Sequence, residues 1–140
     1  MPFPDRTDSI AFNREVILRS RARGDIAVTR GAYASLVESW KQQNANSGGA
    51  LQREVDAVKR EYSDWVRSDP LYLQIREAAI EVIRHRRGLM QTELYGLLAQ
   101  FQKTDVQYAL YFAAEHGFII RTKKGRSYVL SLPDTKPSAQ

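Results

Sequence analysis

The 140-residue chain contains no cysteine and only two histidines. Without cysteine it can form neither a disulfide nor a thiolate metal site, and two histidines are too few for a histidine-rich metal site. We therefore expect no bound metal and no disulfide framework.

Long apolar runs are missing as well. No run approaches the roughly 20 residues that a membrane-spanning helix needs. The N-terminus carries acidic side chains, whereas a signal peptide begins with a basic end followed by an apolar run. We therefore expect a cytoplasmic protein without a membrane partner.

The residue patterns of an enzyme are also absent. The chain has no glycine loop of the kind that holds phosphates, and no serine–histidine or cysteine–histidine arrangement that suggests a nucleophile. Glu77 and Glu81 share one helix face, but Arg76 and Arg84 lie beside them, as on an ordinary salt-bridged surface. We expect no catalytic residue, no cofactor and no enzymatic activity.

Positive charge is present but unevenly distributed. The net charge is +5, with 11 Lys and Arg against 10 Asp and Glu in residues 1–69, and 10 against 6 in residues 70–140. A basic excess in one part of a chain is a feature of polyanion-binding surfaces, although the same charge can serve solubility alone. The positions of the charges must decide between these two interpretations.

Residues 1–69 are expected to form an N-terminal arm and a helical hairpin. Two prolines among the first four residues argue against regular structure at the start. Apolar spacing then predicts helices over about 10–23, 30–43 and 50–67.

The third of these helices has an apolar seam whose members recur alternately at four and three positions, as in a coiled coil. The seam comprises Leu51, Val55, Val58, Tyr62 and Trp65. Two heptads are too few for an independent coiled coil. The seam therefore packs against the preceding helix or against the same helix of a second subunit, and we expect a homodimer.

A boundary follows at Asp69-Pro70, because proline excludes the preceding residue from the α region and suits a helix's first turn. Apolar spacing predicts a helix over about 71–86. The next expected elements are a minimal strand at Leu89-Met90 and a helix over Thr92–Phe101, with a tight break after it.

A second helix, Asp105–His116, has a buried stripe at helical spacing and ends at a glycine. Two β-type runs follow, with either Phe118 and Ile120 or the residues between and after them pointing inward. The stripe is Val106, Leu110 and Ala113, the glycine is Gly117, and the runs Phe118–Thr122 and Ser127–Leu132 are joined by Lys123-Lys124-Gly125-Arg126.

Hydroxyl side chains stand where four of these helices are expected to begin. Such side chains accept hydrogen bonds from the first backbone N–H groups of a helix, and a glutamine three residues later completes a capping box. The expected N-caps are Ser9, Thr29, Thr92 and Thr104, the last with Gln107 as its box partner.

The order of elements over about residues 71–132 resembles the winged helix-turn-helix superfamily, which occurs in many small bacterial regulators. The resemblance is carried by Thr92-Glu93-Leu94 with Leu97-Leu98, the Val106/Leu110/Ala113 stripe, Glu115-His116-Gly117-Phe118-Ile119, and Tyr128-Val129-Leu130. It implies a mainly α fold with a small β-hairpin (α+β). Residues 1–69 would precede a winged helix-turn-helix domain at 70–132, with a disordered tail at 133–140.

The resemblance also implies a function. In that superfamily the second helix of the motif lies in the major groove of DNA and the wing approaches the backbone. The chain would then be a small transcriptional regulator that binds double-stranded DNA with the helix at about 104–116 and the wing at 121–126. The DNA-binding residues would be Lys103, Thr104, Gln107, Tyr108, Tyr111, Arg121, Lys123, Lys124 and Arg126.

The helix over 104–116 differs from a strongly sequence-reading helix. It contains no arginine, which often reads guanine, and it carries Asp105 and three aromatic residues. Aromatic side chains are favoured at protein interfaces. The alternative is therefore a protein-interaction module or adaptor that binds a partner through Tyr108, Tyr111 and the neighbouring Phe112.

Overall fold

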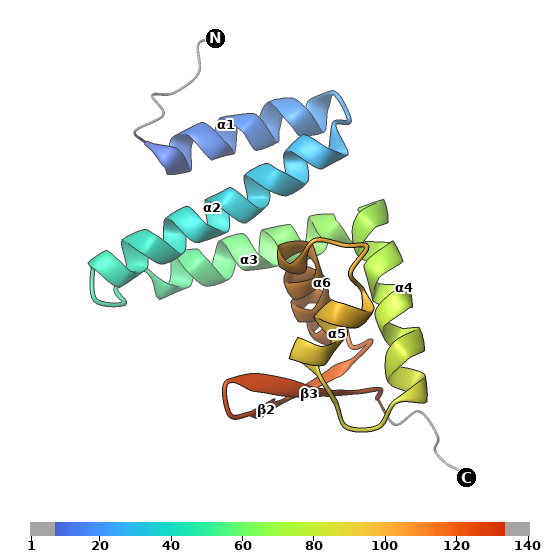
Figure 1. Ribbon diagram of the computed structural model, residues 1–140. Coiled ribbons are helices and arrows are strands. Elements are labelled where there is room, and N and C mark those ends of the chain that lie inside the picture. The colour runs from blue at the N-terminus through green and yellow to red at the C-terminus, as the bar shows by residue number, and fades with distance from the viewer. Residues whose placement is uncertain (1–7, 134–140) are drawn as a thin grey trace. The chain divides into compact units, whose positions relative to one another are not determined.

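The computed structural model describes residues 8–133. The chain divides between Val66 and Arg67 into two compact units (Figure 1). The sequence-based predictions of a loose arm before residue 9 and of a disordered tail at 133–140 fall almost wholly outside the described residues.

Three helices make up the first unit: α1 (Ser9–Ala22), α2 (Ile26–Asn46) and α3 (Gln52–Val66). The middle helix, α2, packs against both of the others (Figure 1). The predicted seam of α3 is largely buried, with Val55, Val58 and Tyr62 at most 3% exposed. The ring of Tyr62 stacks on that of Tyr33 from α2, with 5.2 Å between ring centroids.

Both predicted N-caps of this unit are wrong, because an aspartate further upstream takes each role. Asp8 accepts from the N–H of Ala11, and Asp25 accepts from the N–H of Val28. Thr29 instead lies inside α2, where its hydroxyl is 2.8 Å from the backbone oxygen of Asp25. A threonine hydroxyl can bond back to its own helix in this way, so it does not by itself mark a helix start.

The second unit holds three helices and a small antiparallel sheet (Figure 1). The elements are α4 (Pro70–His85), β1 (Leu89–Met90), α5 (Gln91–Leu97), α6 (Lys103–Glu115), β2 (Ile120–Lys124) and β3 (Ser127–Ser131). The sheet order is β1-β3-β2, so the minimal strand β1 pairs with the last strand. The predicted mainly α fold with a small β-hairpin is confirmed.

The core of the second unit forms where α4 and α5 cover α6 and β3. The predicted stripe of α6 is buried: Val106, Leu110 and Ala113 are at most 1% exposed. Phe112 is also only 1% exposed, so its predicted place on the outer face is wrong. The buried face of α6 is therefore wider than the predicted stripe.

In the second unit, the N-caps of α5 and α6 differ from the predictions, and the structure decides which residues before and in β2 point inward. Neither predicted threonine caps its helix: α5 begins at Gln91, where the Glu93 carboxylate accepts from the N–H of Met90 at 2.9 Å, and α6 begins one residue before Thr104. Ile119 points into the core, while its neighbours Phe118 and Ile120 remain 39% and 43% exposed. The apolar spacing of the predicted helix over Thr92–Phe101 places Leu97 on its inward face with Leu94 and Leu98, but Leu97 is 44% exposed because α5 ends at that residue.

Candidate nucleic-acid interface

The outer face of α6 carries most of the residues that the sequence nominated on this helix. Thr104, Gln107, Tyr108 and Tyr111 recur at three- and four-residue spacing, so they lie along one side, opposite the buried stripe. Thr104 and Gln107 are exposed, whereas the two tyrosines are half-buried. Lys103 is exposed at the first residue of the helix.

The two tyrosines are held by Phe112, the buried ring between them. Tyr108 stacks on Phe112 at 6.0 Å between ring centroids, and Tyr111 meets Phe112 edge-on at 5.3 Å. Such aromatic pairs have preferred geometries and restrict side-chain freedom. The outer face of α6 is therefore a pre-arranged aromatic surface with polar residues towards its N-terminal end.

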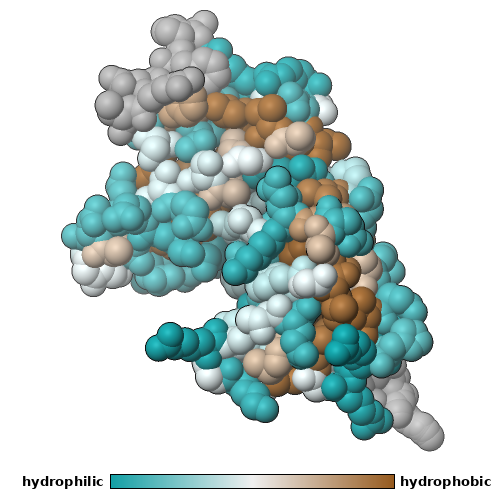
Figure 2. Space-filling view, viewed as in Figure 1, coloured by the Kyte–Doolittle hydropathy of each residue, from teal (hydrophilic) through white to brown (hydrophobic). Residues whose placement is uncertain are grey.

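The β-hairpin carries the other nominated residues. Lys124 pairs with Ser127, so only Gly125 and Arg126 connect the two strands. Gly125 has φ of 63°, a left-handed conformation that glycine adopts readily and that suits a two-residue hairpin turn. Lys123, Lys124 and Arg126 are exposed, and the tip of the hairpin is hydrophilic (Figure 2).

Tyr128 of β3 organises the cations on one face of this hairpin. It lies directly opposite Lys123, and its ring centroid is 5.0 Å from the Lys123 Nζ and 3.9 Å from the guanidinium carbon of Arg121. A cation over a tyrosine face is attracted by the ring quadrupole. One ring therefore supports two positive charges.

A hydrogen-bonded chain connects this hairpin to the two helices. The Nε of Arg121 donates to Oε1 of Gln91 at 3.1 Å, and Nε2 of Gln91 donates to the Tyr95 hydroxyl at 2.7 Å. The Nζ of Lys103 lies 5.2 Å from the centroid of the Tyr95 ring. Two hydrogen bonds thus join the hairpin to α5, and one cation–ring contact joins α5 to the start of α6.

Sequence reasoning did not nominate Gln91, Tyr95 or Tyr128. The alternation of β3 does place Tyr128 on the same face as Leu130. A two-residue turn at Gly125-Arg126 then places Tyr128 opposite Lys123. Gln91 and Tyr95 are four residues apart, so in a helix that includes both they lie on one face. This spacing could have predicted their contact. The contact between Gln91 and Arg121, 30 residues apart, had no local signal.

Among residues 8–133, the cations of the hairpin have no acidic partner. Residues 118–132 contain four Lys and Arg and no Asp or Glu. Within the described range, no ion pair involves Arg121, Lys123, Lys124 or Arg126. The ion pairs of the second unit instead join residues of α4, such as Arg84 with Glu81 at 2.7 Å. The hairpin therefore presents uncompensated positive charge.

A separate contact fixes the C-terminal end of α6 against α4. The Tyr72 hydroxyl and His116 Nδ1 are 2.7 Å apart, and the two rings meet edge-on. Burial raises the pKa of the Tyr72 phenol, against the lowering effect of Arg76. This pair holds two helices together within the core, and we assign it a structural role.

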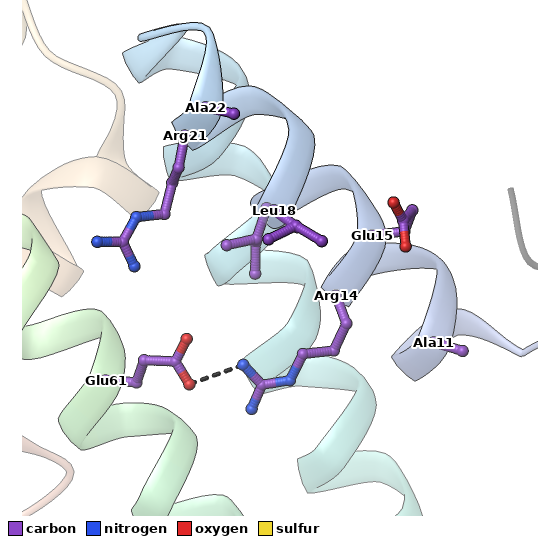
Figure 3. Close-up of a pocket in the computed structure, with 8 residues that line it drawn as sticks. Ala11, Arg14, Glu15, Leu18, Arg21, Ala22 and Glu61 are labelled. Atoms are coloured by element: carbon purple, nitrogen blue, oxygen red, sulfur yellow. Dashed lines mark hydrogen bonds and ion pairs between the residues drawn. The ribbon is translucent and has the colours of Figure 1, made fainter. Parts of the chain in front are cut away.

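The first unit has a groove beside α1 that is lined by both apolar and charged side chains (Figure 3). Arg14 of α1 reaches across it and bonds Oε1 of Glu61 from α3 at 2.7 Å. The other carboxylate oxygen accepts from the buried hydroxyl of Tyr33 at 3.0 Å, and Arg21 donates to that hydroxyl. These side chains satisfy one another, so the groove carries a structural network that joins three helices.

Hydrophobic residues gather over α1 in the surface view (Figure 2), where Leu18 is 66% exposed. Across residues 8–133, no helix has the length and apolar character that crossing a membrane requires. In the same range, no three His, Asp or Glu side chains come together as a metal site.

Comparison with known proteins finds no match for this chain among protein-family models, curated sequences or solved structures. The function must therefore be argued from the geometry described above.

Proposed function

We propose that residues 70–132 form a winged helix-turn-helix domain that binds double-stranded DNA. The support is the order α4, β1, α5, α6, β2, β3 together with the sheet order β1-β3-β2, in which the hairpin follows directly after the second helix of the motif. In this arrangement α6 enters the major groove and the hairpin is the wing that meets the backbone.

One observation carries the proposal: in the described part of the chain, the cations of the wing and of the start of α6 have no acidic partner, and three of them, Arg121, Lys123 and Lys103, lie over tyrosine rings. Cations held in place and left uncompensated attract phosphates and release counterions when they bind them. Basic residues that only keep a protein soluble need neither the contacts with tyrosine rings nor the hydrogen bond between Arg121 and Gln91.

The roles of the individual residues follow from their positions. Gln107 is exposed at the middle of the outer face of α6, where its amide can bond the edge of an adenine at two points. The cations and the hydroxyls of this face bind phosphates and set the register of the protein on the duplex. The phosphate-binding group comprises Lys103, Thr104, Tyr108, Tyr111, Arg121, Lys123, Lys124 and Arg126.

The decisive measurement is duplex binding as a function of salt concentration. Affinity for a random duplex should fall steeply with salt, and Lys124→Ala with Arg126→Ala should weaken binding to every sequence alike. Arg53→Ala with Arg60→Ala is the matched control, because it removes the same charge from exposed positions of α3. No duplex binding at low salt would refute the proposal.

We further propose that the protein acts as a homodimeric transcriptional regulator, with the N-terminal helices supplying the contact between subunits. A two-fold protein would read two half-sites about one helical turn of DNA apart. Sedimentation at several protein concentrations tests the dimer, and a monomer throughout would exclude it.

A second candidate function rests on the composition of α6 itself. Its outward face offers two tyrosines, and the helix carries Asp105 and Glu115 against the single cation Lys103. Such a face suits a protein partner better than DNA. If α6 is a protein-binding surface, Tyr108→Ala with Tyr111→Ala should release a co-purifying partner without weakening duplex binding, and the Tyr→Phe pair, which keeps the stacking on Phe112, should retain it.

A further inference from the structure

Gln91 is a buried polar residue at the centre of the contacts that connect α5 to the wing. It is the first residue of α5 and is only 6% exposed. Its side chain lies between the guanidinium of Arg121 and the hydroxyl of Tyr95. A buried amide that lost these partners would be unsatisfied, so this position tolerates only one arrangement of its neighbours.

The chemistry of the three groups fixes the direction of the hydrogen bonds. A guanidinium only donates, so the atom of Gln91 that faces Arg121 at 3.1 Å must be the carbonyl oxygen Oε1. The NH₂ group then faces Tyr95, whose hydroxyl accepts at 2.7 Å. Each end of the amide therefore has a partner of the correct type.

These contacts use only part of the Arg121 guanidinium. The Nε–H bonds Gln91, and the Tyr128 ring lies 3.9 Å from the guanidinium carbon. The four N–H groups on the two terminal nitrogens are the ones that suit a phosphate oxygen pair. Arg121 is thus held along its Nε edge and over a ring, with its phosphate-binding groups not used by either contact.

We propose that Gln91 is a positioning residue for the wing: it holds Arg121 ready to bind a DNA phosphate, without touching the DNA itself. This inference rests on the proposed DNA binding. Its physical basis is preorganisation, because an arginine that is ordered before binding loses less side-chain freedom when the phosphate arrives.

The first test observes Arg121 in the protein without DNA. The Nε–Hε resonance of Arg121, assigned by its disappearance in Arg121→Lys, should be sharp and protected from solvent exchange. Gln91→Met removes both hydrogen bonds and should make this resonance exchange rapidly. Gln91→Glu keeps an acceptor for Arg121 and should restore the protection. An unchanged resonance in Gln91→Met would overturn the proposal.

The second test measures binding of a random duplex at low salt. Gln91→Met should weaken binding about tenfold, the lower end of the range for one hydrogen bond to a charged group. The same change in an Arg121→Ala background should have no further effect, because the two residues act as one unit. Gln74→Met, at an exposed glutamine of α4, is the control and should bind as the unchanged protein does. Additive losses in the double variant would contradict the positioning role.

The two tests separate the possible failures. If no variant, including the unchanged protein, binds duplex, the proposed function is wrong, and the Arg121 resonance still decides whether Gln91 orders the wing. If Gln91→Met does not fold by circular dichroism, Tyr95→Phe tests the same chain from its other end. It removes the acceptor for Gln91 and should speed exchange at Arg121, and unchanged exchange would overturn the proposal.

Discussion

The two units of the chain both carry several basic side chains, and they use them differently. In the first unit Arg14 bonds Glu61 at 2.7 Å and Arg19 bonds Glu15 at 2.8 Å, so each of these two arginines is compensated by a carboxylate. In the hairpin of the second unit, Arg121 and Lys123 lie over the ring of Tyr128 and, as far as the described residues show, have no acidic partner.

This difference shows why the number of basic residues is a poor guide to polyanion binding. A cation that already holds a carboxylate must give up that partner, or share it, before it can bind a phosphate. A cation on an aromatic ring keeps its hydrogen-bond donors available. We therefore expect the hairpin, and not the arginines of α1, to supply affinity for DNA.

The largest expected effect comes from removing the charge of the hairpin. Lys123→Ala, Lys124→Ala and Arg126→Ala together should lower duplex affinity roughly a hundredfold at low salt and reduce the slope of log affinity against log salt by about three. Fluorescence anisotropy with a labelled duplex measures both quantities. The same number of charges removed from α1 and its C-cap, with Arg14→Ala, Arg19→Ala and Arg23→Ala, should change affinity less than about threefold. Equal losses in the two triple variants would abolish the distinction between the units.

A smaller effect separates base reading from phosphate binding within the second unit. Gln107→Ala should reduce the preference for the best binding site over a random duplex by about tenfold while leaving the salt slope unchanged, because in the proposed complex the amide contacts a base edge. Selection from a randomised duplex pool, followed by competition binding, gives this ratio. If the preference stays as it was, α6 does not read sequence through Gln107.

Alkaline pH should act on both units, because each has a tyrosine with a raised pKa. Burial raises the pKa of the Tyr33 phenol, with a further rise from its hydrogen bond to Glu61, and burial also raises that of Tyr72. In the unfolded chain both phenols ionise near pH 10. The contribution of each to stability is thus complete below about pH 10 and is lost as the pH rises through the higher pKa of the folded state.

Denaturant unfolding at pH values on either side of 10 checks this expectation. Tyr33→Phe and Tyr72→Phe should each make the free energy of unfolding fall less steeply with pH, whatever their effect at neutral pH. If neither change alters the pH profile, these phenols do not control the loss of stability at alkaline pH.

The smallest expected effect concerns the ion pair across the groove of the first unit. The side chains of Arg14 and Glu61 are 45% and 36% exposed, so solvent screens the pair. Arg14→Ala should lower the free energy of unfolding by only about 0.5 kcal/mol, as measured by urea denaturation. Glu61 would still accept from Tyr33, so a loss of several kcal/mol would mean that the network is more strongly coupled than its exposure implies.

Sequence reasoning succeeded where the signal is local. The stripe of Val106, Leu110 and Ala113 and the strand Leu89-Met90 follow from the spacing of apolar residues. Gly125 marks the hairpin because few other residues adopt its backbone conformation. These features depend on neighbouring residues alone.

Sequence reasoning failed where a cap, a burial or a contact depends on residues that are distant in the chain, or where two neighbouring residues are chemically equivalent. Asp8 and Ser9 are both good N-caps and adjacent, so the pattern could not choose between them. The burial of Phe112 is set by tertiary packing and does not follow from the apolar spacing of α6. The same holds for the candidate site. The basic, polar and aromatic residues of α6 and the hairpin could be chosen from the sequence by residue type and position. The hydrogen bond between Gln91 and Arg121 could not be predicted, because it forms only when folding brings α5 next to β2.

The single ring of Tyr128 beneath two cations has a thermodynamic consequence for the wing itself. Arg121 and Lys123 repel each other, and this repulsion opposes the folded hairpin when no anion is present. Added salt should therefore make the hairpin more resistant to opening, as measured by hydrogen exchange of its amides, over the same range of salt concentration in which we expect it to weaken the proposed binding to DNA. Ionic strength would then shift the protein between a bound form ordered by phosphates and an unbound form ordered by small counterions.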